Sequence, residues 1–441
     1  MSSLNLRAIQ QLCIMRCGGR HNIHQNCALV LLVCCLFSSV SAFSRPHVEF
    51  DSSVELDRQV STTLHYLATG NLAQARLFAR QLAWRFPRFA LGNLLSAELE
   101  SMAAFQDVTI SQNNQLSGKL LNLLLEAQAR LKTSNTSSGD TIPAQVIQLG
   151  NNVSEVLLVD LSSSTLFQFA AGQSKPTLIR QHYISSGKAG YGKLLEGDNK
   201  TPLGVYKLTG RRSDASLPDL YGSGALILDY PNALDQRLGR TGSGIWLHGV
   251  PHGQRSRAPR SSEGCVTMSN DHFTRLHDGI SISDSRVILS DRVTWVSKTQ
   301  QKLDQNFFRA LFEQYQRAWA TSDPVALARI YQGGEFQQGQ IRLNSADFIK
   351  VLEAFPHSHD APLTPDYLQA LTSIPSDKIS VFRSPSLGAT GKTGNTLSRE
   401  NYVVMSAYLG GDNEHQITIF WVQGEDRQWR VLTERLDGEI I

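Results

Sequence analysis

The sequence predicts a multidomain chain with an N-terminal α-helical segment, a mainly-β central domain and a C-terminal α+β domain. Three observations lead to this prediction. Apolar residues recur at helical spacing over 53–105, short apolar or β-branched runs separated by turns follow from residue 145, and helical spacing returns after residue 291 before three strand-like runs. Helices followed by antiparallel strands indicate an α+β layout for the last part.

The composition is that of a folded globular protein. The chain has 441 residues, of which 41% are hydrophobic and 18% charged, and this length favours two to four domains. The formal net charge of +3 comes from Arg7, Arg16 and Arg20, so the rest of the chain has 39 basic and 39 acidic residues. A neutral body argues against nucleic-acid binding driven by bulk charge, and no nucleic-acid partner is predicted.

Residues 1–42 are predicted to be a secretory signal peptide. A basic start and the apolar stretch 28–37 are followed by the small residues Val40 and Ala42, which places the mature start at Phe43. This stretch is shorter than the roughly 20 residues that span a bilayer, so we expect no membrane span after cleavage; an uncleaved anchor is the alternative. The predicted location, after secretion across the inner membrane, is the periplasm or cell envelope. Five of the six cysteines lie in this leader, so the body keeps only Cys265 and forms no internal disulfide.

Residues 43–132 are predicted to be a helical domain. Turns are expected at Gly70-Asn71 and at Pro87, and a further helix at about 116–131. The unit resembles one tetratricopeptide helical pair, through Gly70, Ala75 and Pro87. We expect a small bundle that packs on the next domain, with a docking surface for a protein partner as the alternative. The polar stretch within 133–143 is predicted to be a linker.

Short strands separated by turns predict a sandwich or a barrel-like sheet for residues 144–297, with the last strand closing it. The expected strands are 146–147, 156–159, 166–169, 178–184, 205–208, 225–228, 245–247 and 286–289.

Residues 298–441 are predicted to form the α+β domain. A helical run ends at Asp323-Pro324, where Pro324 starts the next helix, and strands are expected at 402–408, 416–422 and 429–432. The Ala-Trp-Ala-x-x-Asp run at 318–323 and the terminal strand pair resemble the nuclear-transport-factor-like cone. We interpret this part as a binding or assembly domain.

Cys265 and His248 are the candidate catalytic pair. A free thiol is mostly protonated at neutral pH, and a histidine within hydrogen-bond reach takes its proton and later protonates a leaving amine. His252 competes with His248 for the base role, and His248 is preferred because it ends an apolar strand. The two histidines with Cys265 also suggest zinc, but the set lacks a fourth ligand, so no metal and no cofactor is predicted.

The central domain resembles the L,D-transpeptidase catalytic domain of the YkuD type. Three blocks occur in the family's order, and the resemblance implies a thiol nucleophile, an acyl-enzyme and peptidoglycan stem tetrapeptides as substrate. Two positions depart from the commonest motif, with Glu263 in place of histidine and Thr267 in place of arginine or asparagine. The matching blocks are Ser186-Gly187 with Glu196-Gly-Asp-Asn-Lys-Thr-Pro-Leu-Gly204, Ile245-Trp-Leu-His-Gly249, and Ser262-Glu-Gly-Cys-Val266.

The prediction is therefore a cysteine-dependent L,D-transpeptidase that cross-links the cell wall or attaches proteins to it. A peptidoglycan hydrolase or amidase on the same fold, and a non-catalytic wall-binding or assembly protein, remain the alternatives. Gly264, Ser262 and Gly249 are predicted to support the site, with the Gly264 and Cys265 N–H groups as oxyanion donors. The remaining candidates are substrate contacts from one loop, namely Arg255, Arg257 and Arg260.

Overall fold

The computed structural model describes residues 52–104, 118–133, 141–172, 176–338, 341–344, 346–347, 350, 365–385, 401–409 and 415–437. The predicted signal peptide and most of the predicted linker lie outside these ranges. Within them, no helix has both the length and the apolar character needed to cross a bilayer.

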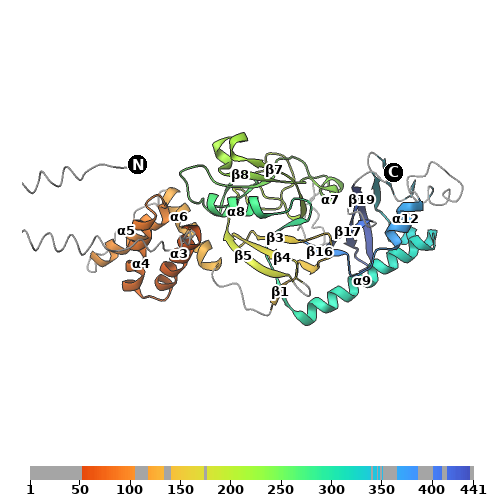
Figure 1. Ribbon diagram of the computed structural model, residues 1–441, viewed down its shortest axis with the longest axis horizontal. Helices are drawn as coiled ribbons and strands as arrows, with labels where there is room; N and C mark the ends of the chain where they lie inside the picture. Colours follow the sequence, from red (N-terminus) through yellow and green to blue (C-terminus); the bar gives the residue numbers. More distant parts are fainter. Residues whose placement is uncertain are drawn as a thin grey trace, which may run out of the picture. The chain divides into compact units, whose positions relative to one another are not determined.

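Four helices form the helical segment: α3 (Ser52–Ala68), α4 (Leu72–Arg85), α5 (Ala90–Ala104) and α6 (Gly118–Thr133) (Figure 1). The predicted turn at Gly70-Asn71 is confirmed, because Gly70 adopts a φ of 74° and the Asn71 side chain caps α4 by accepting the Gln74 N–H. Leu64, Ala79 and Leu82 are fully buried in the small core that these helices share.

The central domain is built on one eight-stranded mixed sheet with the order β11-β9-β8-β7-β12-β3-β4-β5. β12 pairs with both β3 and β7, so the strand that was expected to close the sheet lies inside it. A short parallel pair, β6 with β10, lies beside this sheet. The strands are β3 (Glu155–Asp160), β4 (Thr165–Ala170), β5 (Thr177–Tyr183), β6 (Ser186–Gly187), β7 (Gly204–Ser213), β8 (Gly224–Leu228), β9 (Trp246–His248), β10 (Arg260–Ser262), β11 (Val266–Thr267) and β12 (Ser285–Ser290).

The C-terminal part is a seven-stranded sheet with the order β15-β14-β19-β18-β17-β16-β2. Its edge strand β2 (Val146–Gln148) was predicted in the central domain, but it pairs with β16. The short β1 (Thr141–Pro143), within the predicted linker, pairs with β13 (Trp295–Ser297). The other strands are β14 (Glu335–Gln338), β15 (Ile341–Asn344), β16 (Ser380–Ser384), β17 (Asn401–Leu409), β18 (His415–Gln423) and β19 (Trp429–Asp437).

Three helices, α9 (Lys298–Ala320), α10 (Pro324–Ile330) and α12 (Pro365–Thr372), cover one face of the C-terminal sheet. Asp323 caps α10 by accepting the N–H groups of Val325 and Ala326, which confirms the predicted start at Pro324. The other face packs on the central sheet, where Phe382 and Phe420 share a core with Phe167 and Ile288.

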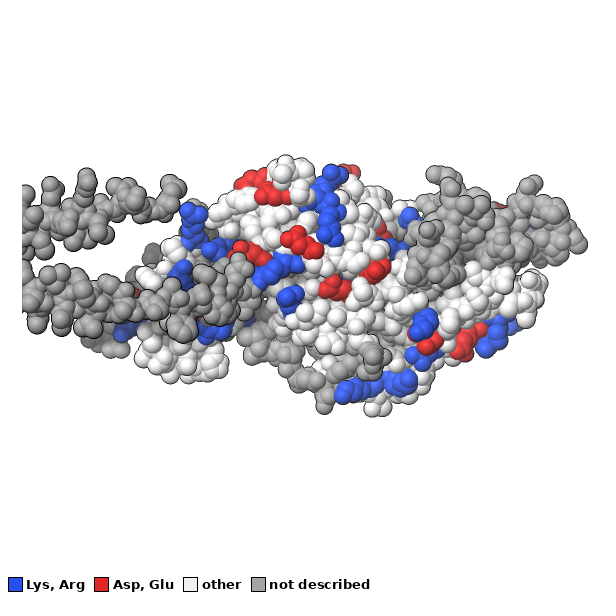
Figure 2. Space-filling view, in the orientation of Figure 1, with Lys and Arg blue, Asp and Glu red and all other residues white. Residues whose placement is uncertain are grey.

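The second face of the central sheet packs against α8 (Asn270–Gly279) through Phe273 and Leu276. A short helix, α7 (Ala233–Arg237), precedes β9. Lys and Arg side chains are interspersed with Asp and Glu over the face shown in Figure 2, in keeping with the neutral composition of the body.

Candidate active site

The histidine predicted as the base ends a strand in the interior of the central sheet. β9 lies between β8 and β11, and Leu247 points into the core while His248 lies on the opposite face. The Tyr221 ring meets the His248 ring edge-on at 5.0 Å between centroids. The imidazole is buried, and its orientation is therefore set by packing.

A hydrogen bond to the main chain decides which nitrogen of this imidazole is basic. His248 Nδ1 lies 2.7 Å from the Gly249 carbonyl oxygen, which only accepts, so Nδ1 carries the proton and Nε2 keeps its lone pair. Burial lowers the pKa of His248 to about 4; the Gly249 hydrogen bond opposes this shift and the Arg257 charge adds to it. His248 is therefore neutral at pH 7 and can accept a proton at Nε2.

The cysteine follows a loop that buried hydroxyl groups hold in place. Cys265 directly precedes β11, which pairs in parallel with β9, so the loop ends beside the histidine strand. Ser262 Oγ donates to the Cys265 carbonyl at 2.6 Å and accepts the Gly264 N–H at 3.2 Å. Thr201 Oγ1 donates to the Gly264 carbonyl at 2.9 Å and accepts the Gly187 N–H, so it links two of the three motif blocks.

Position 264 requires glycine because of its backbone conformation and because there is no room for a side chain. Its φ of 133° is one that residues with a side chain rarely adopt, and an added Cβ would lie 2.9 Å from the Lys200 carbonyl oxygen. The N–H groups of Gly264 and Cys265 were predicted to donate to an oxyanion. Because the Gly264 N–H donates to Ser262 Oγ, the Cys265 N–H is the remaining donor of these two.

Cys265 and His248 line the same open cavity of about 520 Å³. The thiol is half-buried and lies 3.4 Å from the Gly244 carbonyl oxygen. Burial raises the pKa of Cys265, and the Glu263 charge adds to this, whereas a hydrogen bond from the Trp246 backbone and the charges of Arg257 and Lys193 lower it. The thiol is therefore protonated at neutral pH and needs a base to become a nucleophile.

The carboxylate that replaces the family's histidine points to solvent. The Glu263 side chain is 82% exposed, and its Oε1 lies 3.3 Å from Lys188 Nζ. Burial therefore changes the pKa of Cys265 more than the exposed Glu263 charge does.

His252 lies apart from the cavity of Cys265. Its ring nitrogens contact the carboxylates of Asp219 and Asp214 at 2.7 and 3.2 Å, and these contacts raise its pKa, the hydrogen bond to Asp219 contributing most. Of the two candidate bases, the structure thus places His248 and not His252 with the cysteine. The part of the chain that the structure describes holds no group of three acidic, histidine or cysteine side chains suited to a metal.

The three predicted arginine contacts separate in the structure. Arg257 lines the cavity of Cys265. Arg255 instead lies over the Phe86 ring of the helical segment, and Arg260 lies over the Tyr191 ring. Gly249 contributes its carbonyl to the histidine, and its lack of a side chain leaves room for Asn270 Oδ1, which would lie 2.1 Å from an added Cβ.

Two cavity residues were missed by the sequence analysis. Tyr221 comes from a short 3-10 turn and packs on His248, and no motif in the sequence marks it. Lys193 is buried, and its Nζ donates to Asp198 Oδ1 and the Leu195 carbonyl, both at 2.9 Å. Asp198 also accepts backbone N–H groups of its own turn and so caps that turn.

Residues 154–289 match the family described as the L,D-transpeptidase catalytic domain (YkuD). No curated protein sequence matches the chain significantly. Among solved structures, Bd1075 from Bdellovibrio bacteriovorus is 24% identical with a TM-score of 0.50, covering 68% of this chain and 99% of its own. The helical cell shape determining protein Pgp2 from Campylobacter jejuni is 18% identical with a TM-score of 0.47, covering 70% and 99%. An L,D-transpeptidase from Mycobacterium smegmatis is 16% identical with a TM-score of 0.21, covering 31% and 58%.

The fold and the matched residues define the class: the central part of this chain is a domain of the L,D-transpeptidase family, and the likeness to Bd1075 concerns the fold. The family match covers residues 154–289 only. The tetratricopeptide-like and nuclear-transport-factor-like resemblances of the flanking parts therefore stay predictions.

Proposed function

We propose that this protein is a thiol acyltransferase that acts on peptidoglycan stem peptides, with Cys265 as the nucleophile and His248 as its base. The observation that supports this most is the shared cavity, in which a half-buried thiol lies with an imidazole whose Nε2 is free of a proton. The family match of residues 154–289 supplies the substrate class.

The reaction begins with transfer of the thiol proton to His248 Nε2. The thiolate attacks the carbonyl carbon of the third stem residue, and the Cys265 N–H faces the oxygen that becomes negative. His248 returns the proton to the amine of the departing D-alanine, which leaves an acyl thioester on Cys265. An amine of a second stem, or water, then resolves the thioester.

The low pKa of His248 and the raised pKa of Cys265 favour the neutral pair over the ion pair in the resting site. The proton therefore moves during the attack. Arg257, which lines the same cavity, is placed to contact an anionic group of the peptide.

The test is incubation of the protein with disaccharide-tetrapeptide, followed by mass spectrometry of the intact chain and measurement of released D-alanine. We expect an adduct on Cys265 and D-alanine release, both lost in Cys265→Ala and His248→Gln. His252→Gln is the matched control and should keep both. Wild-type protein that forms no adduct and releases no D-alanine from cognate muropeptides would refute the proposal.

The products separate transfer from hydrolysis. Cross-linked dimers indicate an amine acceptor and a role in cell-wall biogenesis and cell shape, whereas trimmed monomers indicate a hydrolase on the same fold. Glu263 faces solvent beside the thiol, so it is placed to direct water, which favours testing hydrolysis in the same assay. Since the proposed substrate lies outside the cytoplasm, the proposed location is the periplasm or cell envelope.

A further inference from the structure

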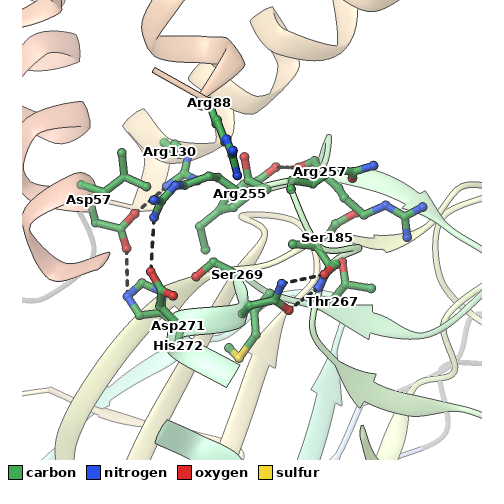
Figure 3. A pocket seen from close by; sticks show the side chains of 18 residues that line it. Asp57, Arg88, Arg130, Ser185, Arg255, Arg257, Thr267, Ser269, Asp271 and His272 are labelled. Atoms are coloured by element: carbon green, nitrogen blue, oxygen red, sulfur yellow. Dashed lines mark hydrogen bonds and ion pairs between the residues drawn. The ribbon is translucent and has the colours of Figure 1, made fainter. Parts of the chain in front are cut away.

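A second cavity lies between the helical segment and the central domain, and it shares Arg257 with the cavity of Cys265. Its volume is about 210 Å³, enough for several waters at about 30 Å³ each or for a group the size of one amino acid. Figure 3 shows Arg88 reaching into it from the helical segment, with Thr267 and Ser269 on the side of the central domain.

The charges of this second cavity do not cancel. Its lining includes four arginines and two aspartates. Arg130 pairs with Asp57 at 2.8 Å and with the buried Glu126 at 3.0 Å, and Arg255 pairs with Asp271 at 3.3 Å, so these two arginines are neutralised. Arg88 and Arg257 form no ion pair with any residue that the structure describes. Burial lowers the pKa of His272, which therefore adds no positive charge at pH 7. The cavity thus favours an anion.

A buried hydroxyl without a partner points to a ligand in the same cavity. Thr267 is 1% exposed, and its Oγ1 has no hydrogen-bond partner among the described residues. The buried Ser269 Oγ, also in the lining, likewise has none there. A buried polar group that lacks a hydrogen bond costs free energy, and a bound acceptor such as a carboxylate oxygen would satisfy both hydroxyls.

The loop that carries Arg257 is held to the helical segment. Ser256 Oγ donates to Glu126 Oε1 at 2.7 Å, and the Tyr183 hydroxyl donates to the Arg257 carbonyl at 2.8 Å. Arg255 lies 5.6 Å from the centre of the Phe86 ring. The helical segment therefore supplies a wall of this cavity and fixes the residue that joins it to the cavity of Cys265.

We infer that the second cavity is a carboxylate-binding subsite for the stem peptide, in which Arg88, Arg257, Thr267 and Ser269 hold the anion. This inference rests on the proposed function, which supplies peptides as substrate. The carboxylate has two sources, the free end of the acyl-donor peptide or a carboxylate of the acceptor diamino acid. Both present the same oxygens to the same donors.

The test measures binding by isothermal titration calorimetry to the full chain carrying Cys265→Ala. The donor probe is a stem tetrapeptide with a free C-terminal carboxylate, compared with its C-terminal amide. The acceptor probe is free diaminopimelate, compared with its diamide. Arg88→Gln and Thr267→Val are added singly, and Arg212→Gln, which removes a charge from the exposed end of β7, is the control.

We expect Arg88→Gln and Thr267→Val each to weaken binding of one carboxylate probe by about tenfold, the size typical of a lost hydrogen bond to a charged group. The amide forms should bind weakly to every variant, and the probe that loses affinity identifies the source of the carboxylate. The inference is overturned if carboxylate and amide forms bind within twofold of each other, if Arg88→Gln matches Arg212→Gln, or if no probe binds.

Acylation of wild-type Cys265, measured separately by mass spectrometry, keeps the two proposals apart. An adduct without carboxylate discrimination refutes the subsite alone. Carboxylate discrimination without an adduct refutes the nucleophile alone.

Discussion

Thr201 carries the contact that joins the Glu196–Gly204 turn to the cysteine loop, and we expect Thr201→Val to destabilise the central domain. Thr201 is fully buried, and its Oγ1 donates to the Gly264 carbonyl and accepts the Gly187 N–H, both at 2.9 Å. Valine has nearly the same shape, so it leaves no cavity, but both backbone groups lose their partner. At about 1–3 kcal/mol for each of the two unsatisfied groups, the free energy of unfolding should fall by about 2–6 kcal/mol.

Urea unfolding followed by tryptophan fluorescence measures this loss. Thr209→Val is the matched control, because Thr209 is exposed and its hydroxyl makes only a 3.4 Å hydrogen bond to the Ile227 carbonyl. We expect the control to change the free energy of unfolding by less than about 0.5 kcal/mol. If Thr201→Val unfolds at the same urea concentration as Thr209→Val, the two hydrogen bonds do not hold the loop and the reasoning fails.

Two further predictions concern the residues before the thiol. The Glu263 charge raises the pKa of Cys265, so Glu263→Gln should lower that pKa and speed alkylation of the thiol by iodoacetamide at pH 7. The increase should be no more than about fivefold, because Glu263 is exposed. Glu196→Gln is the control, and an unchanged or slower alkylation rate in Glu263→Gln contradicts this effect of the Glu263 charge. Gly264→Ala should cost about 1–3 kcal/mol in stability through its φ of 133° and its contact with the Lys200 carbonyl, and an unchanged melting temperature would show that the loop relaxes freely.

Local patterns in the sequence were sufficient to predict several of the elements and to select His248 and Cys265, which line one cavity. Helical spacing located α3 and α4, and short apolar runs bounded by turns located β3 and β4, because these patterns reflect which side chains are buried in a core. His248 was preferred to His252 from the apolar strand before it, and that strand is β9, which places the imidazole beside the cysteine loop.

Long-range pairing could not be predicted in the same way. β2 has the same apolar character as a strand of the central sheet, yet it pairs with β16, which is more than 200 residues away in the sequence. β12 looked like a closing strand because it comes last, but its parallel pairing with β3 places it in the interior of the sheet. The residues of a strand indicate which of its faces are buried, but they do not indicate which strand pairs with it.

The same limit explains the arginine loop. Arg255, Arg257 and Arg260 are equivalent by charge, and their surroundings in the fold distinguish them. Phe86 lies under Arg255 and Glu126 lies beside Ser256, whereas Arg260 lies over Tyr191. The part of the loop that holds Arg255 and Ser256 is thus positioned by residues that precede it by more than 100 positions in the sequence.

The helical segment and the C-terminal part both pack against the central domain and support its structure. One face of the central sheet packs on α8, and the other shares a core with the C-terminal sheet, in which Phe167 and Ile288 contact the cluster that contains Phe382 and Phe420. A sheet with two apolar faces must be covered on both, so the C-terminal part stabilises the sheet whose strand β9 carries His248. The helical segment, in turn, holds the loop that carries Arg257. The positions of His248 and Arg257 therefore depend on contacts from all three parts of the chain.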